Sequence, residues 1–315
     1  MSLRRSARTR TRDPHAFWAF RDVVLYTLQY LTLAQVAQFA AVDKRSNQYA
    51  KTYVRGRITR YTSPFLPTSE GALLLGRFFQ ALDVTTSWIV GSVALAATCF
   101  LSDPPHPDNL NIITPRRSLG IWANFMLKEA RYLLVHRAWS SGRYSEAGRM
   151  MLIFMHPGTG KRYVSITAAA TPSLGALFFA APNTDGLIAI AAHSVISPVP
   201  RFVCEQRHLF GWRTHTRSVV PVGDDPPSRW EPRFPGVTTL EFSTANWGRP
   251  CGATCPGVWH DACGLQHWGE LNWGGWDGAD WKSDAALALI GKGRLRYRYG
   301  VNCDNPLCPN SNMSV

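Results

Sequence analysis

The sequence predicts an α+β (or α/β) fold, in which helices precede a mixed sheet and a loop-rich tail follows it. Apolar residues recur first at helical spacing and then in the order strand, helix, strand, helix and a cluster of strands. Hydrophobic residues make up 45% and charged residues 17% of the 315 positions, which is typical of a globular chain with a sizeable core. We divide the chain into a basic arm (1–14), a helical segment (15–65), a unit of helices and strands (66–245) and a tail rich in Trp and Cys (246–315).

The arm is the most basic part of a chain whose net charge is +13. Its first 12 residues contain no acid and carry Arg4, Arg5, Arg8, Arg10 and Arg12. This pattern is typical of a disordered terminus, and it is also that of a nuclear-import or nucleic-acid-binding tail.

Targeting and membrane segments are not predicted. The N-terminus lacks the apolar stretch of a signal peptide. The longest uncharged run, Val84–Ser102, contains Thr, Ser and Gly and fits a buried strand, turn and helix better than a membrane span. We therefore expect an intracellular protein, cytoplasmic or nuclear, with no membrane partner.

Residues 16–58 carry the apolar spacing of amphipathic helices. Thr32 is expected to cap a short helix that runs through Ala40, and Asp43 a third helix. With Tyr30-Leu31, Thr32-Leu33 and Val42–Ser46 at its junctions, the segment resembles an F-box without the family's usual initial Leu-Pro pair. The resemblance implies that its apolar side chains bind a Skp-type adaptor. The alternative is a helical cap on the chain's own sheet.

The next pattern is a short apolar strand, Trp88–Val90, that runs into Gly91-Ser92 and a helix of small residues. A second apolar strand then carries Asn109 and Asn111, which share one face and are expected to point back toward the Gly-Ser turn. A Gly-Ser turn that opens a helix has backbone N–H groups for phosphate.

This layout resembles the nucleotidyltransferase superfamily over about residues 68–200, where Gly-Ser is followed by Asp-x-Asp on the next strand. Both carboxylate positions are Asn here, and the later strands 150–155 and 162–167 contain no acid. The resemblance thus implies the scaffold of an enzyme without its Mg²⁺ ligands. Over residues 15–245 the chain is similar to basidiomycete fungal proteins that join an F-box-like start to a degenerate nucleotidyltransferase-like domain.

Three functions follow as hypotheses. The first is a non-catalytic interaction protein, a pseudoenzyme that serves as a ubiquitin-ligase adaptor for an unknown protein substrate. The second keeps a nucleotide with Mg²⁺, or residual transferase activity: Gly91 and Ser92 would hold phosphates, Asn109 and Asn111 a weak Mg²⁺ or the ribose, and Arg116 or Arg117 would neutralise charge. The third is a nucleic-acid-binding protein whose affinity falls with salt.

The tail offers zinc candidates that we do not favour. Most of the seven cysteines lie here, and two ligand sets are conceivable: Cys251, Cys255, Cys303 and Cys308, or the more local Cys251, Cys255, His260 and Cys263. Neither set has the tight spacing of a zinc knuckle, so free cysteines in a loop-rich tail are the preferred interpretation. The many tail tryptophans are expected to anchor this irregular segment to the sheet, with a base- or sugar-stacking surface as the alternative.

Overall fold

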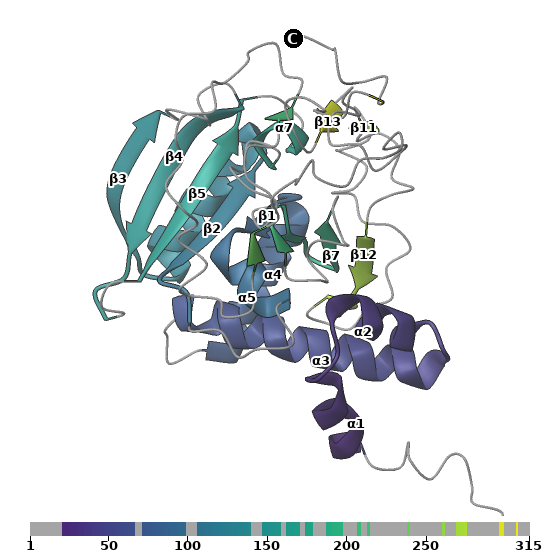
Figure 1. Cartoon of the computed structure of the whole chain (residues 1–315). Helices are drawn as coiled ribbons and strands as arrows, with labels where there is room; N and C mark the ends of the chain where they lie inside the picture. The colour runs from purple at the N-terminus through teal and green to yellow at the C-terminus, as the bar shows by residue number, and fades with distance from the viewer. Residues whose placement is uncertain are drawn as a thin grey trace, which may run out of the picture.

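The computed structural model describes residues 21–66, 71–98, 106–139, 147–158, 162–170, 174–178, 187–197 and 269–275, together with 207–208, 213–214, 238–239, 260–261, 296–298 and 307. These residues form a mixed helix-and-sheet protein, which agrees with the predicted α+β class (Figure 1). In the ranges described, no helix combines the length and the apolar character needed to cross a bilayer.

Three helices open the described part of the chain: α1 (Arg21–Leu28), α2 (Leu33–Ala40) and α3 (Lys44–Thr62). The caps expected from the sequence are present. Thr32 accepts a bond from the Gln35 N–H while the Gln35 side chain accepts one from the Thr32 N–H, which is a complete capping box. Asp43 accepts from the N–H of Ser46 and fixes the start of α3.

Helix α3 is joined to the sheet-bearing part of the chain by a buried arginine. Arg57 donates from Nε to the carbonyl of Ala97 and from Nη2 to that of Ala96, at 3.0 and 2.8 Å. Both carbonyls lie in the last turn of α5 (Ser92–Thr98), where they have no partner within the helix. A cation at a helix C-terminus is also favoured by the helix dipole. One hydrophobic core cluster accordingly includes residues from α3 and from the sheet.

The main sheet has eight strands in the order β12-β7-β6-β1-β2-β5-β4-β3. Only β2 and β5 run parallel, and every other neighbouring pair in this sheet is antiparallel. The bounds of the strands are β1 Trp88–Val90, β2 Asn109–Thr114, β3 Leu133–Trp139, β4 Gly148–Met155, β5 Tyr163–Ala169, β6 Ala189–Ile190, β7 Ser194–Ser197 and β12 Gly269–Asn272.

The remaining strands are short and form two small sheets. Strand β10 (Thr238–Thr239) pairs with β8 (Arg207–His208), and β13 (Arg296–Arg298) lies between β11 (His260–Asp261) and β9 (Arg213–Thr214).

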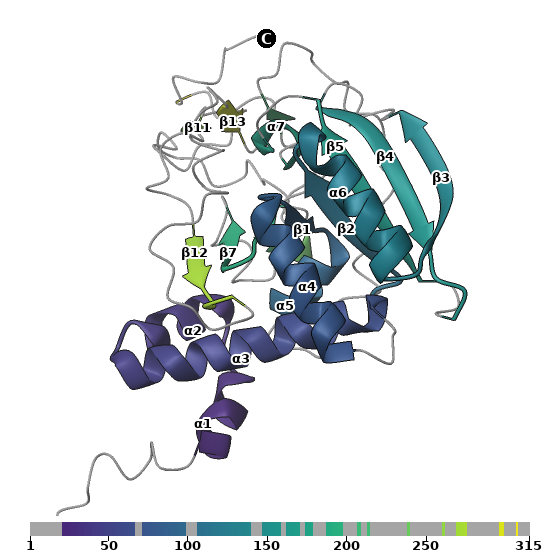
Figure 2. The same ribbon diagram turned by 180° about the vertical axis from the view of Figure 1, so that it is seen from behind.

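Helices cover one face of the central strands, as Figure 2 shows for α4 and α6 in front of β1 and β2. The helices on this face are α4 (Gly71–Val84), the short η3 (Arg116–Ser118) and α6 (Leu119–Asn124) with its π-helical continuation η4 (Phe125–Glu129). Helix α7 (Gly175–Phe178) instead packs Phe178 on Trp88 of β1, at a centroid distance of 5.5 Å. Phe78 of α4 makes an edge contact with Trp122 of α6 at a centroid distance of 5.5 Å, so aromatic packing holds these two helices together.

The tail contributes to the same core. Strand β12 pairs with β7, and the next residue, Trp273, is fully buried with its ring 5.4 Å from that of Phe79 in α4. For Trp273, the expected anchoring role is therefore confirmed. The other tail tryptophans (Trp247, Trp259, Trp268, Trp276 and Trp281) lie outside the described residues.

Candidate functional site

The Gly-Ser turn lies beside the beginning of β2. Val90, the last residue of β1, is paired with Asn111, so the chain leaves β1 next to the two asparagines. Gly91 has φ +73°, a left-handed conformation that glycine adopts without strain. A Cβ added at Gly91 would lie 2.8 Å from Asn111 Nδ2, which means that the Asn111 amide packs directly on the turn.

Four polar side chains meet at this point and form one hydrogen-bonded group, which we call the amide cluster: Ser92, Asn109, Asn111 and Ser165. Ser92 Oγ is 3.1 Å from Asn109 Oδ1 and 3.2 Å from the Asn109 carbonyl, and it donates toward both. Asn109 Nδ2 donates to Asn111 Oδ1 at 2.9 Å. The shared face of the two asparagines and its direction toward Ser92 are as the spacing predicted.

Ser165 is the member that the sequence did not identify. It lies on β5 in parallel register with Asn111, and its Oγ donates to Asn111 Oδ1 at 2.6 Å. The absence of acids in this strand was visible in the sequence, but the residue that faces Asn111 depends on a register between distant segments. Ser165 and Ser92 are both buried, so a buried hydroxyl lies beside each of the two asparagines.

The chemistry of the cluster is that of neutral groups that satisfy one another. An amide has two donors and an oxygen acceptor, so neighbouring asparagines can bond to each other, which two carboxylates cannot do when ionised. Asn109 directs an N–H donor at Asn111, at the place where a Mg²⁺ site requires oxygen acceptors and negative charge. The residues present therefore do not fit a Mg²⁺ site of the nucleotidyltransferase kind.

The two arginines assigned to phosphate neutralisation lie elsewhere. Arg116 and Arg117 belong to η3, which follows β2, whereas Asn109 is the first residue of that strand. Ser92 is bonded to Asn109 at the first end of β2, and the two arginines follow the other end. Because a strand rises about 3.3 Å per residue, nearly the whole length of β2 separates the arginines from Ser92. The structure brings Ser92, Asn109 and Asn111 together, and it does not bring Arg116 or Arg117 to them.

The zinc candidates cannot be placed. Cys251, Cys255, Cys263, Cys303 and Cys308 lie outside the described residues, and only the backbone of His260, in β11, is described. The basic arm, 1–14, also lies outside them. In the part of the chain that the structure covers, no group of three or more His, Cys, Asp or Glu residues could hold a metal ion.

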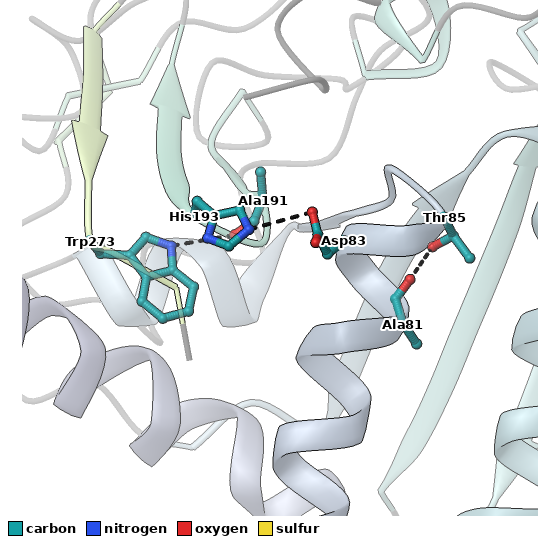
Figure 3. A network of polar contacts seen from close by, with 6 residues as sticks. All are labelled: Ala81, Asp83, Thr85, Ala191, His193 and Trp273. Atoms are coloured by element: carbon teal, nitrogen blue, oxygen red, sulfur yellow. Dashed lines mark hydrogen bonds and ion pairs between the residues drawn. The ribbon is translucent and has the colours of Figure 1, made fainter. Parts of the chain in front are cut away.

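A second polar cluster joins the end of α4 to the turn between β6 and β7 (Figure 3). Buried His193 places Nε2 3.4 Å from Oδ1 of Asp83, which is more exposed. Trp273 donates its backbone N–H to the His193 carbonyl at 2.9 Å and its indole N–H to the Ala191 carbonyl at 3.3 Å. Nothing in the sequence pattern singled out His193 or Asp83, because three separate segments bring them together.

Gly275 packs directly against His193. Its φ is +65°, and a Cβ at this position would lie 2.4 Å from His193 Nδ1. A side chain at position 275 would therefore be strained and would also displace the imidazole. The contacts of His193 with Trp273 and Gly275 hold residues 269–275 of the tail, the tail segment, against the sheet, so the role of this second cluster is structural.

The first helix has two apolar faces. Val24 and Leu28 are buried, each 1% exposed. Val23, Tyr26 and Tyr30 are 48%, 62% and 59% exposed, and they follow one another at helical spacing on α1 and the turn after it. Tyr30 donates its hydroxyl to that of Tyr26 at 2.6 Å, with the rings edge to face. We call Val23, Tyr26 and Tyr30 the outer face of α1.

Comparison with protein-family models, with curated proteins and with solved structures finds no match to the chain. The resemblances to an F-box and to the nucleotidyltransferases stay predictions of the sequence.

Proposed function

We propose that this chain is a non-catalytic interaction protein whose F-box-like helices bind a Skp-type adaptor through the outer face of α1. The observation that carries the proposal is the exposure of Val23, Tyr26 and Tyr30 opposite the buried pair Val24 and Leu28. A helix that is apolar on both faces buries one of them in its own protein and has the other available for a partner.

The position of α1 supports this role. It precedes α2 and α3, and α3 is fixed to the sheet-bearing part by Arg57. Tyrosine suits a binding surface because it offers a large rigid apolar ring and a hydroxyl, at a small cost in conformational entropy. The rest of the chain would then present a protein substrate to the ligase.

The amide cluster supports a non-catalytic role for the nucleotidyltransferase-like part. Ser92, Asn109 and Asn111 stand where the resemblance would put the enzyme motif, and their polar groups are used in bonds to one another. Phosphoryl transfer of this class depends on carboxylates that hold divalent metal ions against the phosphates. The cluster instead stabilises the junction of β1, β2 and β5.

The adaptor proposal is tested with a pull-down of a purified Skp-type adaptor by the full chain. We expect a complex with the wild-type chain and at least a tenfold loss of affinity in a Tyr26→Ser/Tyr30→Ser variant, because exposed residues are changed without disturbing the core. Leu73→Ser is the matched control, since Leu73 of α4 is 57% exposed and lies outside the proposed surface. Absence of a complex with the folded wild-type chain, or equal losses in both variants, would show that the adaptor proposal is wrong.

A second candidate is nucleotide binding at the amide cluster, which is favoured by the convergence of Ser92, Asn109 and Asn111 on the Gly-Ser turn. Calorimetric titration with each nucleoside triphosphate and Mg²⁺ or Mn²⁺ distinguishes the two candidates. Heat of binding that disappears in Asn111→Leu would establish the second one. No heat and no thermal shift would remove it.

A further inference from the structure

Strand β3 is an open edge of the main sheet with an unusually apolar surface. It is the last strand in the order, and among the residues that the structure describes it pairs only with β4; Figure 1 shows it at the outer left of the sheet. Leu133, Val135 and Trp139 are 58%, 50% and 64% exposed. Leu134 and, on the neighbouring strand, Met155 are also exposed.

An edge of this kind has a backbone that is ready to pair. One side of an edge strand carries N–H and C=O groups that no strand of the sheet uses, and proteins usually protect such edges with charges, prolines or bulges. Strand β3 has one such feature, a bulge at Val135 in its pairing with β4. No proline interrupts Leu133–Trp139. Beyond the bulge, His136–Trp139 is a regular edge that can accept an extended chain as a ninth strand, and Arg137 is the charge that selects which chains can pair there.

The charge of this region indicates what kind of chain it accepts. His136 and Arg137 lie on β3 and Arg149 on β4, and all three are exposed. The Arg149 guanidinium lies 5.6 Å from the centre of the Trp139 ring, so the cation is held over the apolar surface. The residues of β3, β4 and β5 include no Asp or Glu.

We propose that β3 binds an extended acidic peptide segment of a partner protein by strand addition. Backbone hydrogen bonds to β3 would supply affinity. The register with β4 places Leu134, Arg137 and Trp139 on one face of the sheet and Leu133 on the other, because the bulge at Val135 reverses the alternation. Apolar side chains of the peptide would cover Trp139 and Leu133 on their two faces, and its carboxylates would pair with Arg137 and Arg149. The surface is separate from the outer face of α1, and Figures 1 and 2 both show β3 and α1 in different parts of the molecule. The inference therefore goes beyond adaptor binding and does not depend on it.

A second copy of the chain is a poorer occupant of this edge. Pairing of two β3 strands would place two copies of Arg137 in one strand pair with no acid in β3 to offset them, and like charges across a strand pair are destabilising. An acidic peptide gains attraction from the same groups.

The test uses a displayed library of random twelve-residue peptides selected on the full chain. We expect the selected peptides to contain both apolar residues and Asp or Glu, and to lack proline in their centre. The most frequent peptide should bind at least fivefold more weakly to Arg137→Glu than to the wild-type chain, and replacing its acids by lysine should weaken binding at least tenfold. Lys44→Glu, an exposed change of equal charge on α3, should bind as the wild type does. Hydrogen exchange should show protection of residues 133–139.

Three results would overturn the proposal: no selection of acidic sequences, binding unchanged in Arg137→Glu, or protection of β3 by self-association of the chain without peptide. The adaptor pull-down is independent of all three, so its failure is distinguishable from failure of strand addition.

Discussion

At the start of β2, two side-chain amides decide the chemistry of the amide cluster. Asn109 and Asn111 are bonded to one another and to hydroxyls of Ser92 and Ser165, so each side chain has a neutral partner. Ionised carboxylates at the same two positions would be adjacent like charges, and only a cation could relieve their repulsion. The asparagines thus make the junction stable without a metal ion.

The first prediction concerns the variant Asn109→Asp/Asn111→Asp. The two new carboxylates lie close together, so their pKa in the folded chain is raised above that in the unfolded chain. They therefore lower the free energy of unfolding while they are ionised, and this loss becomes smaller as the pH falls. We expect a loss of about 2–4 kcal/mol of unfolding free energy at pH 7 and a clearly smaller loss near pH 4. Urea unfolding at both pH values measures it. A loss that is the same at both would contradict the account of the cluster.

The second prediction concerns Asp43, the cap of α3. Hydrogen bonds from Ser46 hold the pKa of its carboxyl below its usual range. A lowered folded pKa means that the stabilisation is present above the unfolded pKa and is lost as the pH falls through the folded pKa. Asp43→Asn keeps an uncharged cap, so the wild-type chain should lose its advantage in melting temperature over this variant below about pH 4. Thermal melting from pH 3 to 7 tests this. A difference that does not change with pH would show that the cap charge contributes nothing.

At the scale of elements, local signals in the sequence were sufficient for helices α1 to α6 and strands β1 to β5, and they did not identify the shorter strands β6 to β13. Thr32 and Asp43 were expected as caps because their side chains act within one helical turn, and both do so. The pairing of β2 with β5 was not predicted, because it joins segments whose register no local pattern records. Ser165 was missed for this reason. The β12 strand was missed because its four residues lie in a tail without alternating apolar residues.

The third prediction tests the capping box of α2. Thr32→Ala removes the acceptor for the Gln35 N–H, and we expect a loss of about 1 kcal/mol in the free energy of unfolding. Gln35→Ala removes the other bond, from the Thr32 N–H to the Gln35 side chain, and should cost less. The double variant should cost less than the sum, because both bonds order the same turn and the second loss falls on a turn that is already less ordered. A double-mutant cycle by chemical denaturation measures the coupling. Additive losses would mean that the two bonds act independently.

At the scale of the whole molecule, parts that the sequence suggests are separate share one interior. The core cluster contains Val54 of α3, Ile112 of β2 and Trp273 of the tail segment. Helices α1 to α3 are therefore packed on the chain's own sheet, as one of the two interpretations of the sequence expected. This packing leaves the outer face of α1 exposed, so it is compatible with adaptor binding as well.

The fourth prediction follows from this shared interior. Trp273→Ala should destabilise the whole chain by about 3–5 kcal/mol, because a fully buried indole against Phe79 is removed. Trp139→Ala is the matched control, since Trp139 is 64% exposed, and it should cost less than about 1 kcal/mol. Calorimetric unfolding measures both. Similar small losses in the two variants would show that the tail segment is not part of the cooperative core.

Hydrogen exchange of the full chain, with and without a Skp-type adaptor, tests the central claim most directly, because it locates the interface as well as detecting binding. The account predicts slower exchange of backbone amides in residues 21–31, where the outer face of α1 lies, and unchanged exchange in 109–114, which contains the asparagines of the amide cluster. Exchange in 21–31 that is unaffected by saturating adaptor would contradict it.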